Sequence, residues 1–447
     1  MVFAEEAAMT TETADRKWTA RMYFRAARAA LTLVVGLVAV AVAVPPTQAG
    51  QYKVPYYFTG GADGGYPQGH VVLGKNGAMY GAALLGADTN CAYLTNCGEI
   101  FEVDKTGKET TLYNFTGGSD GAGPLGSLIA DSKGNLYGTT IYGGTGPCKR
   151  VQTVVGCGTV FELSPPKGKG GAWTEKILYS FQGSDGMWPY AGLVRDAAGN
   201  LFGTTIVGGT GNCEGYGCGA VFELDHTGSE KVLYSFTGGT DGYGPSGGLT
   251  LDAAGNLYGV TDNGGVLQDC GGTGCGVVFK VSRSGKESVL YSFTGTNGDG
   301  QQPAYVTLVR DSAGNLYGTT EYGGTPEDGL TFGTVFKVSP KGKETILYSF
   351  QGFLDGGYPL VGLVADPEGN LYGSTWDWGY YGYGTLFEVT KSRKFKVVHQ
   401  IQLIDGTGGI GALTWDGHGS LYGAGEGGGD YRYCGGTGCG TVFKFTP

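Results

Sequence analysis

Short runs of apolar residues recur along the chain, separated by turns rich in glycine. Residues 333–338, Gly-Thr-Val-Phe-Lys-Val, alternate apolar and polar side chains, as a half-buried strand does. Apolar runs at 305–310 and 315–320 precede this segment, and another at 345–350 follows it. No segment after the first 49 residues has the 3.6-residue hydrophobic period of a helix. The pattern therefore predicts an all-β fold with four short antiparallel strands in each unit.

The unit is repeated seven times. Each copy holds a phrase close to Leu-Tyr-Gly, whose aromatic residues are spaced by 57, 65, 56, 59, 55 and 50 positions. These aromatic residues are Tyr80, Tyr137, Phe202, Tyr258, Tyr317, Tyr372 and Tyr422. A repeat of this length, built from four strands, predicts a seven-bladed β-propeller.

The phase of the repeats predicts how the ring closes. A copy of the fourth-strand phrase, residues 52–58, precedes any first strand, and the chain stops at Pro447 directly after a third strand. The last blade therefore lacks an outermost strand, which the N-terminal strand can supply. Closure of this kind removes the exposed sheet edges that an open array would leave.

Composition supports a packed β-protein and excludes one class of partner. Glycine makes up 89 of 447 residues without a triplet period, and aromatic residues make up 12%. Disordered glycine-rich sequence lacks such aromatic content. The net charge is −10 and Lys and Arg do not cluster, so no nucleic-acid partner is expected.

The first 49 residues have the features of a targeting segment. Arg21, Arg25 and Arg28 precede an apolar run from residue 29 to 44, and small residues at 47 and 49 suit cleavage before Gly50. Met22 would give a more ordinary leader length. We predict a signal peptide over residues 1–49 and one propeller domain over 50–447, in the extracellular space or periplasm. An uncleaved membrane anchor is the alternative, and without it no membrane contact is expected.

Ten cysteines form five close pairs along the chain. The pairs are Cys91 with Cys97, Cys148 with Cys157, Cys213 with Cys218, Cys270 with Cys275, and Cys434 with Cys439. The second cysteine of each pair comes directly before the glycine that opens a third strand. In an oxidising compartment this spacing favours five local disulfides. A zinc site is less favoured, because each pair belongs to a different repeat.

The two faces of the predicted ring differ in their loops. The Asp-x-x-Gly-Asn hairpins, such as Asp131 to Asn135 and Asp311 to Asn315, lie on one face and are explained by turn chemistry. The cysteine loops and an Asp-Gly turn after each fourth strand lie on the other face. The seven carboxylates of these turns are Asp63, Asp120, Asp185, Asp241, Asp299, Asp355 and Asp405. They favour a structural role in turns, with a ring of Ca²⁺ ligands at the channel mouth as the alternative; no other cofactor is expected.

Aromatic residues mark the places where the blades differ. Tyr66, Trp188, Tyr243 and Tyr358 stand between the Asp-Gly turn and the innermost strand. The sixth blade has no cysteines, and its loop holds Trp376, Trp378, Tyr380 and Tyr381 instead. Aromatic rings beside a carboxylate such as Asp355 suit the stacking of sugars, while packing of the loop is the other interpretation.

Catalytic signals are few. Of the four histidines, only His70 falls on an innermost strand, where a structural role is commoner than that of a base. No nucleophile elbow, zinc-protease motif or phosphate loop occurs. Paired carboxylates for glycoside hydrolysis are compatible with the many Asp residues on the face that holds the cysteine loops, but no pair stands out.

The phrase from Tyr348 to Thr375, with its partner Gly-Thr-Val-Phe-Lys-Val, resembles the GloVer tandem-repeat family of exported bacterial proteins. The resemblance covers residues 52–447. It implies a propeller and commonly a C-terminal anchoring segment, whereas this chain stops at the strand ending in Pro447. It implies no activity and no catalytic residues.

These observations together predict a secreted, monomeric, non-catalytic propeller that binds a polysaccharide on its loop-rich face. A polysaccharide lyase or glycoside hydrolase, and a scaffold for an extracellular protein, are the alternatives.

Overall fold

The structure is a computed structural model that describes residues 50–86, 91, 96–148, 156–168, 170–213, 215–325 and 329–447, without the side chains of 408–410. Residues 49–447 form one compact unit. The predicted leader over residues 1–49 lies outside the described residues. Among the described residues, no helix is long and apolar enough to cross a membrane.

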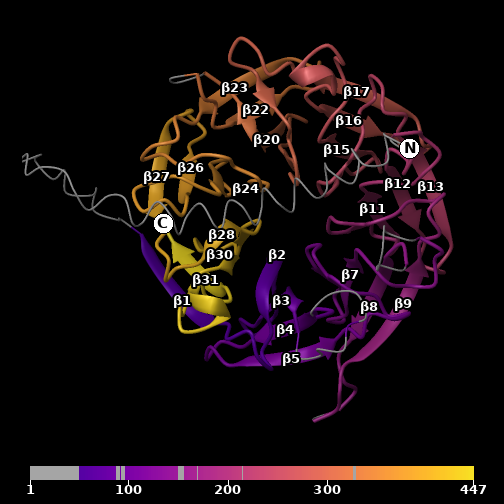
Figure 1. Ribbon diagram of the computed structural model, residues 1–447, viewed down its shortest axis with the longest axis vertical. Coiled ribbons are helices and arrows are strands. Elements are labelled where there is room, and N and C mark those ends of the chain that lie inside the picture. The colour runs from indigo at the N-terminus through magenta and orange to yellow at the C-terminus, as the bar shows by residue number, and fades with distance from the viewer. Residues whose placement is uncertain are drawn as a thin grey trace, which may run out of the picture. The chain divides into compact units, whose positions relative to one another are not determined.

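Seven small antiparallel sheets stand side by side around a ring, as the sequence predicts (Figure 1). The first three blades have the following strands. Blade 1 has β2 (Gly65–Leu73), β3 (Met79–Leu85), β4 (Glu99–Val103) and β5 (Glu109–Asn114). Blade 2 has β6 (Ile129–Ala130), β7 (Leu136–Thr140), β8 (Thr159–Ser164) and β9 (Thr174–Ser180). Blade 3 has β10 (Val194–Arg195), β11 (Leu201–Thr205), β12 (Ala220–Leu224) and β13 (Glu230–Ser235).

The next three blades repeat this order from the inside outward. Blade 4 has β14 (Thr250–Leu251), β15 (Leu257–Thr261), β16 (Val277–Val281) and β17 (Glu287–Ser292). Blade 5 has β19 (Val309–Arg310), β20 (Leu316–Thr320), β22 (Thr334–Val338) and β23 (Glu344–Ser349), beside a small ribbon of β18 (Gly300–Gln301) and β21 (Tyr322–Gly323). Blade 6 has β24 (Val364–Ala365), β25 (Leu371–Ser374), β26 (Thr385–Val389) and β27 (Phe395–Gln400).

Blade 7 closes the ring with both ends of the described chain. It holds β28 (Thr407–Ile410), β29 (Thr414–Trp415), β30 (Leu421–Gly427) and β31 (Thr441–Thr446). Its outermost strand is β1 (Gln51–Tyr57), which pairs with β31 so that Tyr52 lies opposite Phe445. The two short 3₁₀ helices, Cys270–Gly272 and Cys434–Gly436, lie in loops.

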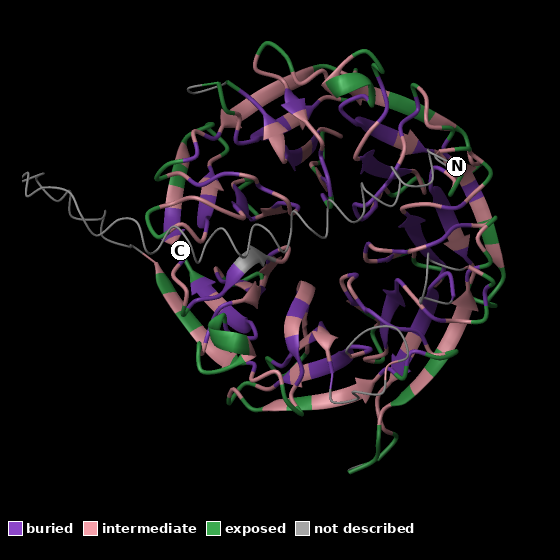
Figure 2. Ribbon diagram, viewed as in Figure 1, coloured by how far each residue is buried: buried purple, intermediate pink, exposed green. Residues whose placement is uncertain are grey.

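The third strand of each blade is more buried than its alternating sequence suggests. In β22, Thr334, Val335, Phe336 and Val338 are buried and only Lys337 reaches solvent. The strand lies inside its own sheet and is covered by neighbouring blades on both faces, which accounts for the difference (Figure 2). The prediction of a half-buried strand was therefore wrong at this position of the blade.

Phenylalanine rings fill the spaces between blades. In six of the seven junctions the phenylalanine that follows an outermost strand packs edge-on against a third-strand phenylalanine of the next blade, as Phe115 does on Phe161 at 5.2 Å between ring centroids. Ile401 takes this place after β27. The third-strand ring covers the glycine of the Leu-Tyr-Gly phrase: a Cβ at Gly318 would stand 2.7 Å from Phe336 Cζ. Glycine in this strand interior is therefore required by close packing.

Five disulfides hold loops on one face of the ring. They join the cysteines in the five local pairs that the spacing favours. The second cysteine of each pair is at most 1% exposed. A set of five disulfides is typical of proteins from oxidising compartments.

Candidate functional site

The loops that follow the second and the fourth strand of each blade lie on the same face of the ring, because successive strands are antiparallel. We call this the loop face. It holds the disulfides, the Asp-Gly turns and all the aromatic candidates. The opposite face holds the short hairpin turns, in which Asp311 accepts hydrogen bonds from the backbone and side-chain nitrogens of Asn315 at 2.8 and 2.7 Å.

The carboxylates of the Asp-Gly turns bond within their own blades. In Asp63, Oδ2 accepts hydrogen bonds from the Tyr56 hydroxyl and the Thr59 backbone N–H, both at 2.8 Å. Similar bonds to an outermost-strand tyrosine and a backbone N–H occur at Asp120, Asp185, Asp241, Asp299 and Asp355. At Asp405, His399 replaces the tyrosine at 2.8 Å.

These bonds tie the seven carboxylates to the outer strands and to their turns. Among the described residues, no group of three or more His, Cys, Asp or Glu side chains is arranged to hold a metal ion. The turn interpretation accounts for the geometry of these residues.

Three aromatic candidates have backbones in the left-handed region. Tyr66, Trp188 and Tyr358 have φ of 53°, 59° and 56°, while the same position holds Gly123 and Gly244 in blades 2 and 4 and Gln302, with φ of 53°, in blade 5. The N–H of each residue donates to a carbonyl of the preceding blade, as Trp188 does to Cys157 at 2.9 Å. A bulky residue is unusual with positive φ, so these aromatic side chains occupy a place where the fold favours glycine.

Tyr243 does not belong to that set. It stands one position before Gly244 and is held by backbone hydrogen bonds with Asn263 at 3.0 and 3.3 Å. The sequence grouped it with the other three because all four stand between the Asp-Gly turn and the innermost strand.

Blade 6 has the strongest departure from the repeat. Trp378 has φ of 65°, and its carbonyl accepts a hydrogen bond from the N–H of Gly384 at 2.9 Å. The residues that make the equivalent bond in other blades are Gly143, Gly208, Gly264, Gly323 and Gly428. Trp378 therefore stands where five other blades have glycine.

Around Trp378 lies a patch that we call the aromatic platform: Phe353, Leu354, Trp378, Tyr380 and Tyr381. Trp378 packs on Phe353 and on Phe332, with ring centroids 6.1 and 5.1 Å away. Phe353 is 55% exposed, Leu354 62%, Tyr380 50% and Tyr381 43%. Phe332, which is 2% exposed, occupies the position that a cysteine has in disulfide-bonded blades. Packing of the loop thus explains Trp378 in part, but it leaves the neighbouring rings open to solvent.

Trp376 occupies a second recurring position, at the loop-face end of the second strand. This position is four residues after the aromatic residue of the Leu-Tyr-Gly phrase. The N–H of Trp376 donates to Tyr358 at 3.1 Å, as that of Glu321 donates to Gln302 and that of Asp262 to Gly244. This position is apolar in blades 1 to 3 and is acidic or aromatic in blades 4 to 7. Its occupants in order are Leu84, Ile141, Ile206, Asp262, Glu321, Trp376 and Glu426. The acidic members were missed from the sequence, although comparing the repeats after the Leu-Tyr-Gly phrase would have revealed them.

Two tyrosines near the centre come from blades that are not adjacent. Tyr305 of blade 5 has φ of 60°, is 42% exposed, and its ring lies 5.0 Å from that of Tyr190 of blade 3. Its N–H donates to Ser246 Oγ at 2.9 Å. Blade 5 has one residue more than blade 4 between the proline and the following leucine, and this insertion brings Tyr305 into place.

Burial and neighbouring charges shift the pKa values of Tyr190, Asp262 and Glu426. Burial, followed by the negative charges of Glu426 and others including Asp262, raises the pKa of Tyr190. Burial also raises the pKa of Asp262 to about 7 and that of Glu426 to about 7, against hydrogen bonds from Ser246 and Gln68 that lower them. The Ser246 hydroxyl, which accepts the N–H of Tyr305, donates to Asp262 Oδ1, so the tyrosine pair and Asp262 bring blades 3, 4 and 5 together. We call Tyr190, Asp262, Tyr305, Glu321, Trp376 and Glu426 the central group.

His70 lies on β2 and has no acidic partner among the causes of its shift. Burial alone lowers its pKa to about 4, so the imidazole is neutral at physiological pH. Its backbone N–H donates to Ser127 Oγ at 3.0 Å.

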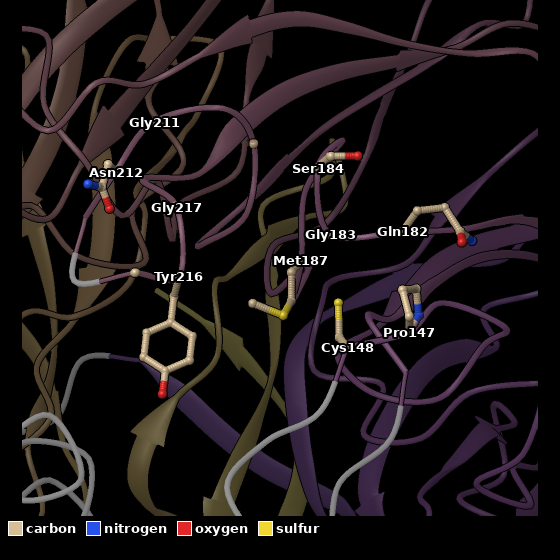
Figure 3. Close-up of a pocket in the computed structure, with 12 residues that line it drawn as sticks. Pro147, Cys148, Gln182, Gly183, Ser184, Met187, Gly211, Asn212, Tyr216 and Gly217 are labelled. Carbon is tan, nitrogen blue, oxygen red and sulfur yellow. The ribbon is translucent and has the colours of Figure 1, made fainter. Parts of the chain in front are cut away.

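A cavity of about 440 Å³ lies elsewhere, between the loops of blades 2 and 3 (Figure 3). Backbone glycines form much of its wall, with Met187 and Tyr216 as the larger side chains. None of the residues singled out from the sequence for ligand binding lines it.

The repeat sequence itself identifies the family. The chain matches the Gloeobacter/Verrucomicrobia repeat over residues 41–273 and 265–447. The chain belongs to this family. No curated protein matches the chain.

Solved structures that resemble this member of the repeat family are distant in sequence. One is the aldose sugar dehydrogenase of Streptomyces coelicolor with bound PQQ, at 13% identity and a TM-score of 0.44, covering 90% of this chain and 100% of that one. A gluconolactonase from Xanthomonas campestris has 11% identity and a TM-score of 0.39, covering 89% of each chain. A luciferin-regenerating enzyme has 11% identity and a TM-score of 0.40, covering 85% of this chain and 91% of the other.

Proposed function

We propose that the protein is an exported binding module that holds a polysaccharide on its loop face. The observation that carries the proposal is the aromatic platform of blade 6, in which Trp378 replaces a glycine and lies beside exposed aromatic rings. Aromatic rings offer apolar faces on which sugars stack, with neighbouring polar groups as anchors. The hydroxyl groups of the exposed Tyr380 and Tyr381 supply such groups, whereas Asp355 Oδ1 is buried and Asp355 Oδ2 accepts hydrogen bonds from Tyr348 and Gln351.

The backbone strain at Trp378 supports a role beyond packing. A left-handed tryptophan costs about 1 kcal/mol or more compared with glycine. Packing alone would be served by the disulfide that five other blades carry in this loop. Export is supported by those same disulfides, which persist in oxidising compartments.

Binding to immobilised polysaccharides, followed by calorimetry with soluble oligosaccharides, tests the proposal. The double variant Tyr380→Ala/Tyr381→Ala should weaken binding at least about tenfold, because stacked aromatic groups dominate such contacts. The matched control is Tyr216→Ala, an exposed tyrosine of blade 3 outside the platform. Equal binding by both variants, or retention on no polysaccharide, would contradict the proposal.

A glycoside hydrolase is the second candidate, and the central group favours it. Asp262 and Glu426 have a pKa of about 7, which suits a general acid near neutral pH. New reducing ends, released from a bound polysaccharide and lost in Glu426→Gln, would establish hydrolysis. Binding without any product supports the non-catalytic module.

A further inference from the structure

One side chain joins the two loops that form the aromatic platform. Two platform residues lie in the loop 351–356 after β23, and the other three lie in the loop 376–383 after β25. Gln400, the last residue of β27, bonds to both loops. Its Oε1 accepts the N–H of Tyr380 at 2.7 Å, and its Nε2 donates to the carbonyl of Leu354 at 2.7 Å. The relative placement of the exposed rings therefore depends on this glutamine.

Gln400 is a departure from the repeat, as Trp378 is. Blades 2 to 5 have serine at this place on the outermost strand, opposite the first residue of the third strand: Ser180, Ser235, Ser292 and Ser349. In blade 3, the Ser235 hydroxyl accepts the N–H of Thr210, the counterpart of Tyr380, at 3.4 Å. Glutamine is longer than serine and carries a donor and an acceptor on one amide group, so it can bridge two loops.

The glycine beside Tyr380 leaves room for this bridge. Gly379 has φ of 76°, and a Cβ at this position would stand 2.8 Å from Gln400 Oε1. The N–H of Gly379 donates to the carbonyl of Phe353 at 2.7 Å, which ties the same two loops a second time. These bonds hold the rings in place before a ligand arrives, so less binding free energy is lost in ordering the site.

The charged residues of the two loops, Asp355 and Asp377, are both engaged in hydrogen bonds. Asp355 Oδ2 accepts from a tyrosine and a backbone N–H, and Asp377 Oδ1 accepts the N–H of Trp378 at 2.8 Å. Among the described residues of all loops on the loop face, Arg432 is the one basic residue, and its Nε lies 2.9 Å from Asp430 Oδ1. An anionic chain would therefore meet no unpaired basic side chain there. The platform itself presents ring faces and hydroxyl groups.

We propose that blade 6 carries a preformed site for a single chain of an uncharged polysaccharide, and that Gln400 is the residue that positions its rings. This inference rests on the proposed function and specifies the class of ligand and how the site is ordered. The rings of Tyr380 and Tyr381 stand at 85° with centroids 4.9 Å apart. Two rings at this angle suit one sugar chain better than the flat surface of a fibre.

Calorimetry with oligosaccharides of equal length tests the class of ligand. The uncharged probes are cellohexaose and N-acetylated chitohexaose, and the charged probes are hexagalacturonate and chitohexaose with free amines. We expect an uncharged probe to bind most tightly. Its affinity should change less than about twofold between low and high salt, because no ion pair is screened.

Gln400→Ser gives blade 6 the residue of blades 2 to 5 and removes the bridge. It should weaken binding of the uncharged probe about fivefold or more, because the loops must then be ordered on binding. In the background Tyr380→Ala/Tyr381→Ala the same change should cost less than about twofold, since Gln400 acts through these rings. Gln182→Ser is the matched control on the loop face, because the amide of Gln182 donates back to the carbonyl of Ser180 in its own blade at 2.8 Å.

Hydrogen exchange of the unliganded protein gives a measurement that does not depend on the ligand. Gln400→Ser should speed the exchange of amides in 351–356 and 376–383 about tenfold, while amides of the other blades exchange as before. An equal rise in all blades would show general destabilisation and would contradict the positioning role.

The outcomes separate this inference from the proposed function. If Tyr380→Ala/Tyr381→Ala weakens binding and Gln400→Ser does not, the inference is wrong and polysaccharide binding stands. The same conclusion follows if exchange in the two loops is unchanged, if Gln400→Ser costs as much without the tyrosines as with them, or if a charged probe binds more tightly than both uncharged ones. Binding to none of the probes and to no immobilised polysaccharide overturns both proposals.

Discussion

At the scale of single residues, the informative positions are those where a bulky side chain stands in a left-handed conformation that other blades give to glycine. Trp378 adopts positive φ where five other blades have glycine. Tyr66, Trp188 and Tyr358 adopt it, as Gln302 does, where blades 2 and 4 have glycine. The N–H at the Tyr66 position donates to the preceding blade in blades 1 to 6, and the carbonyl at the Trp378 position accepts a hydrogen bond in blades 2 to 7. The fold therefore dictates the left-handed conformation, and only the side chain differs.

Replacing Trp378 tests this conformation. Both Trp378→Ala and Trp378→Gly lose the packing on Phe332, but only glycine relieves the left-handed strain. We expect the glycine variant to be more stable than the alanine variant by about 1 kcal/mol in urea unfolding. At ordinary helical or extended positions alanine is the more stable of the two, so the opposite ranking would show that Trp378 is not left-handed.

At the scale of elements, the seam of the ring depends on the N-terminal strand. Tyr52 of β1 stacks on His399 with ring centroids 4.2 Å apart, and its hydroxyl donates to the carbonyl of Asp405 at 3.0 Å. It also stacks on Phe443 at 5.0 Å. One side chain thus joins blade 6 to the two chain ends of blade 7.

Truncation of Tyr52 should weaken the seam. Tyr52→Ala removes the ring contacts with His399, Phe443 and Phe445 and a hydrogen bond, and should lower the free energy of unfolding by about 3 kcal/mol. Lys53→Ala, at the exposed neighbouring position of the same strand, should change it by less than about 0.5 kcal/mol. Chemical denaturation of both variants measures the difference, and similar values for the two would show that β1 contributes only backbone pairing.

The cysteine loops are a second element that can be tested. The Cys213–Cys218 bridge closes a short loop in blade 3, and the chain-entropy model assigns such a loop roughly 2 kcal/mol. The double variant Cys213→Ser/Cys218→Ser should lose about that much stability. Reduction of the unaltered protein with dithiothreitol should lower its melting temperature further, because five bridges are broken.

At the scale of the whole molecule, the junctions between blades form a belt of carboxyl groups. A glutamate that begins the outermost strand faces the Asp-Gly aspartate of the preceding blade in five junctions, at Glu109, Glu175, Glu230, Glu287 and Glu344. Burial and, second, the charge of that aspartate raise the pKa of each glutamate to about 7. In the other two junctions, Phe395 stacks on Tyr348 and Tyr52 stacks on His399.

This belt predicts that stability depends on pH. A carboxyl group whose pKa is higher in the folded than in the unfolded state binds its proton more tightly when the protein is folded. Its contribution to the free energy of unfolding is therefore complete below pH 4.5 and is lost as the pH rises through about 7. The turn carboxylates Asp131, Asp252 and Asp311 have a lowered pKa, so their contribution disappears in stronger acid.

We therefore expect the melting temperature to be highest in mild acid and to fall between pH 5 and pH 8. The triple variant Glu230→Gln/Glu287→Gln/Glu344→Gln should flatten this fall, because glutamine resembles the protonated carboxyl group. Glu368→Gln, which is exposed, should leave the slope unchanged. A melting temperature that rises from pH 5 to pH 8 would rule out the belt as the dominant titrating set.

The sequence by itself determined the architecture. The seven copies of the Leu-Tyr-Gly phrase and the cysteine spacing are local features, and they were enough to specify the blades and the bridges. The phase of the repeats then predicted the pairing of β1 with β31. The reason is that strand period, turn chemistry and short disulfide loops depend on residues that are close together in the chain.

Only the tertiary structure decided which residues share a site. Tyr190 and Tyr305 lie 115 positions apart in sequence numbering, yet their rings lie within 5.0 Å because the ring brings blades 3 and 5 around one axis. Likewise, Asp355 and Trp378 stood out in the sequence, whereas Asp262 and Glu426 did not. The raised pKa of Asp262 and that of Glu426 arise chiefly from burial, and this burial depends on closure of the ring.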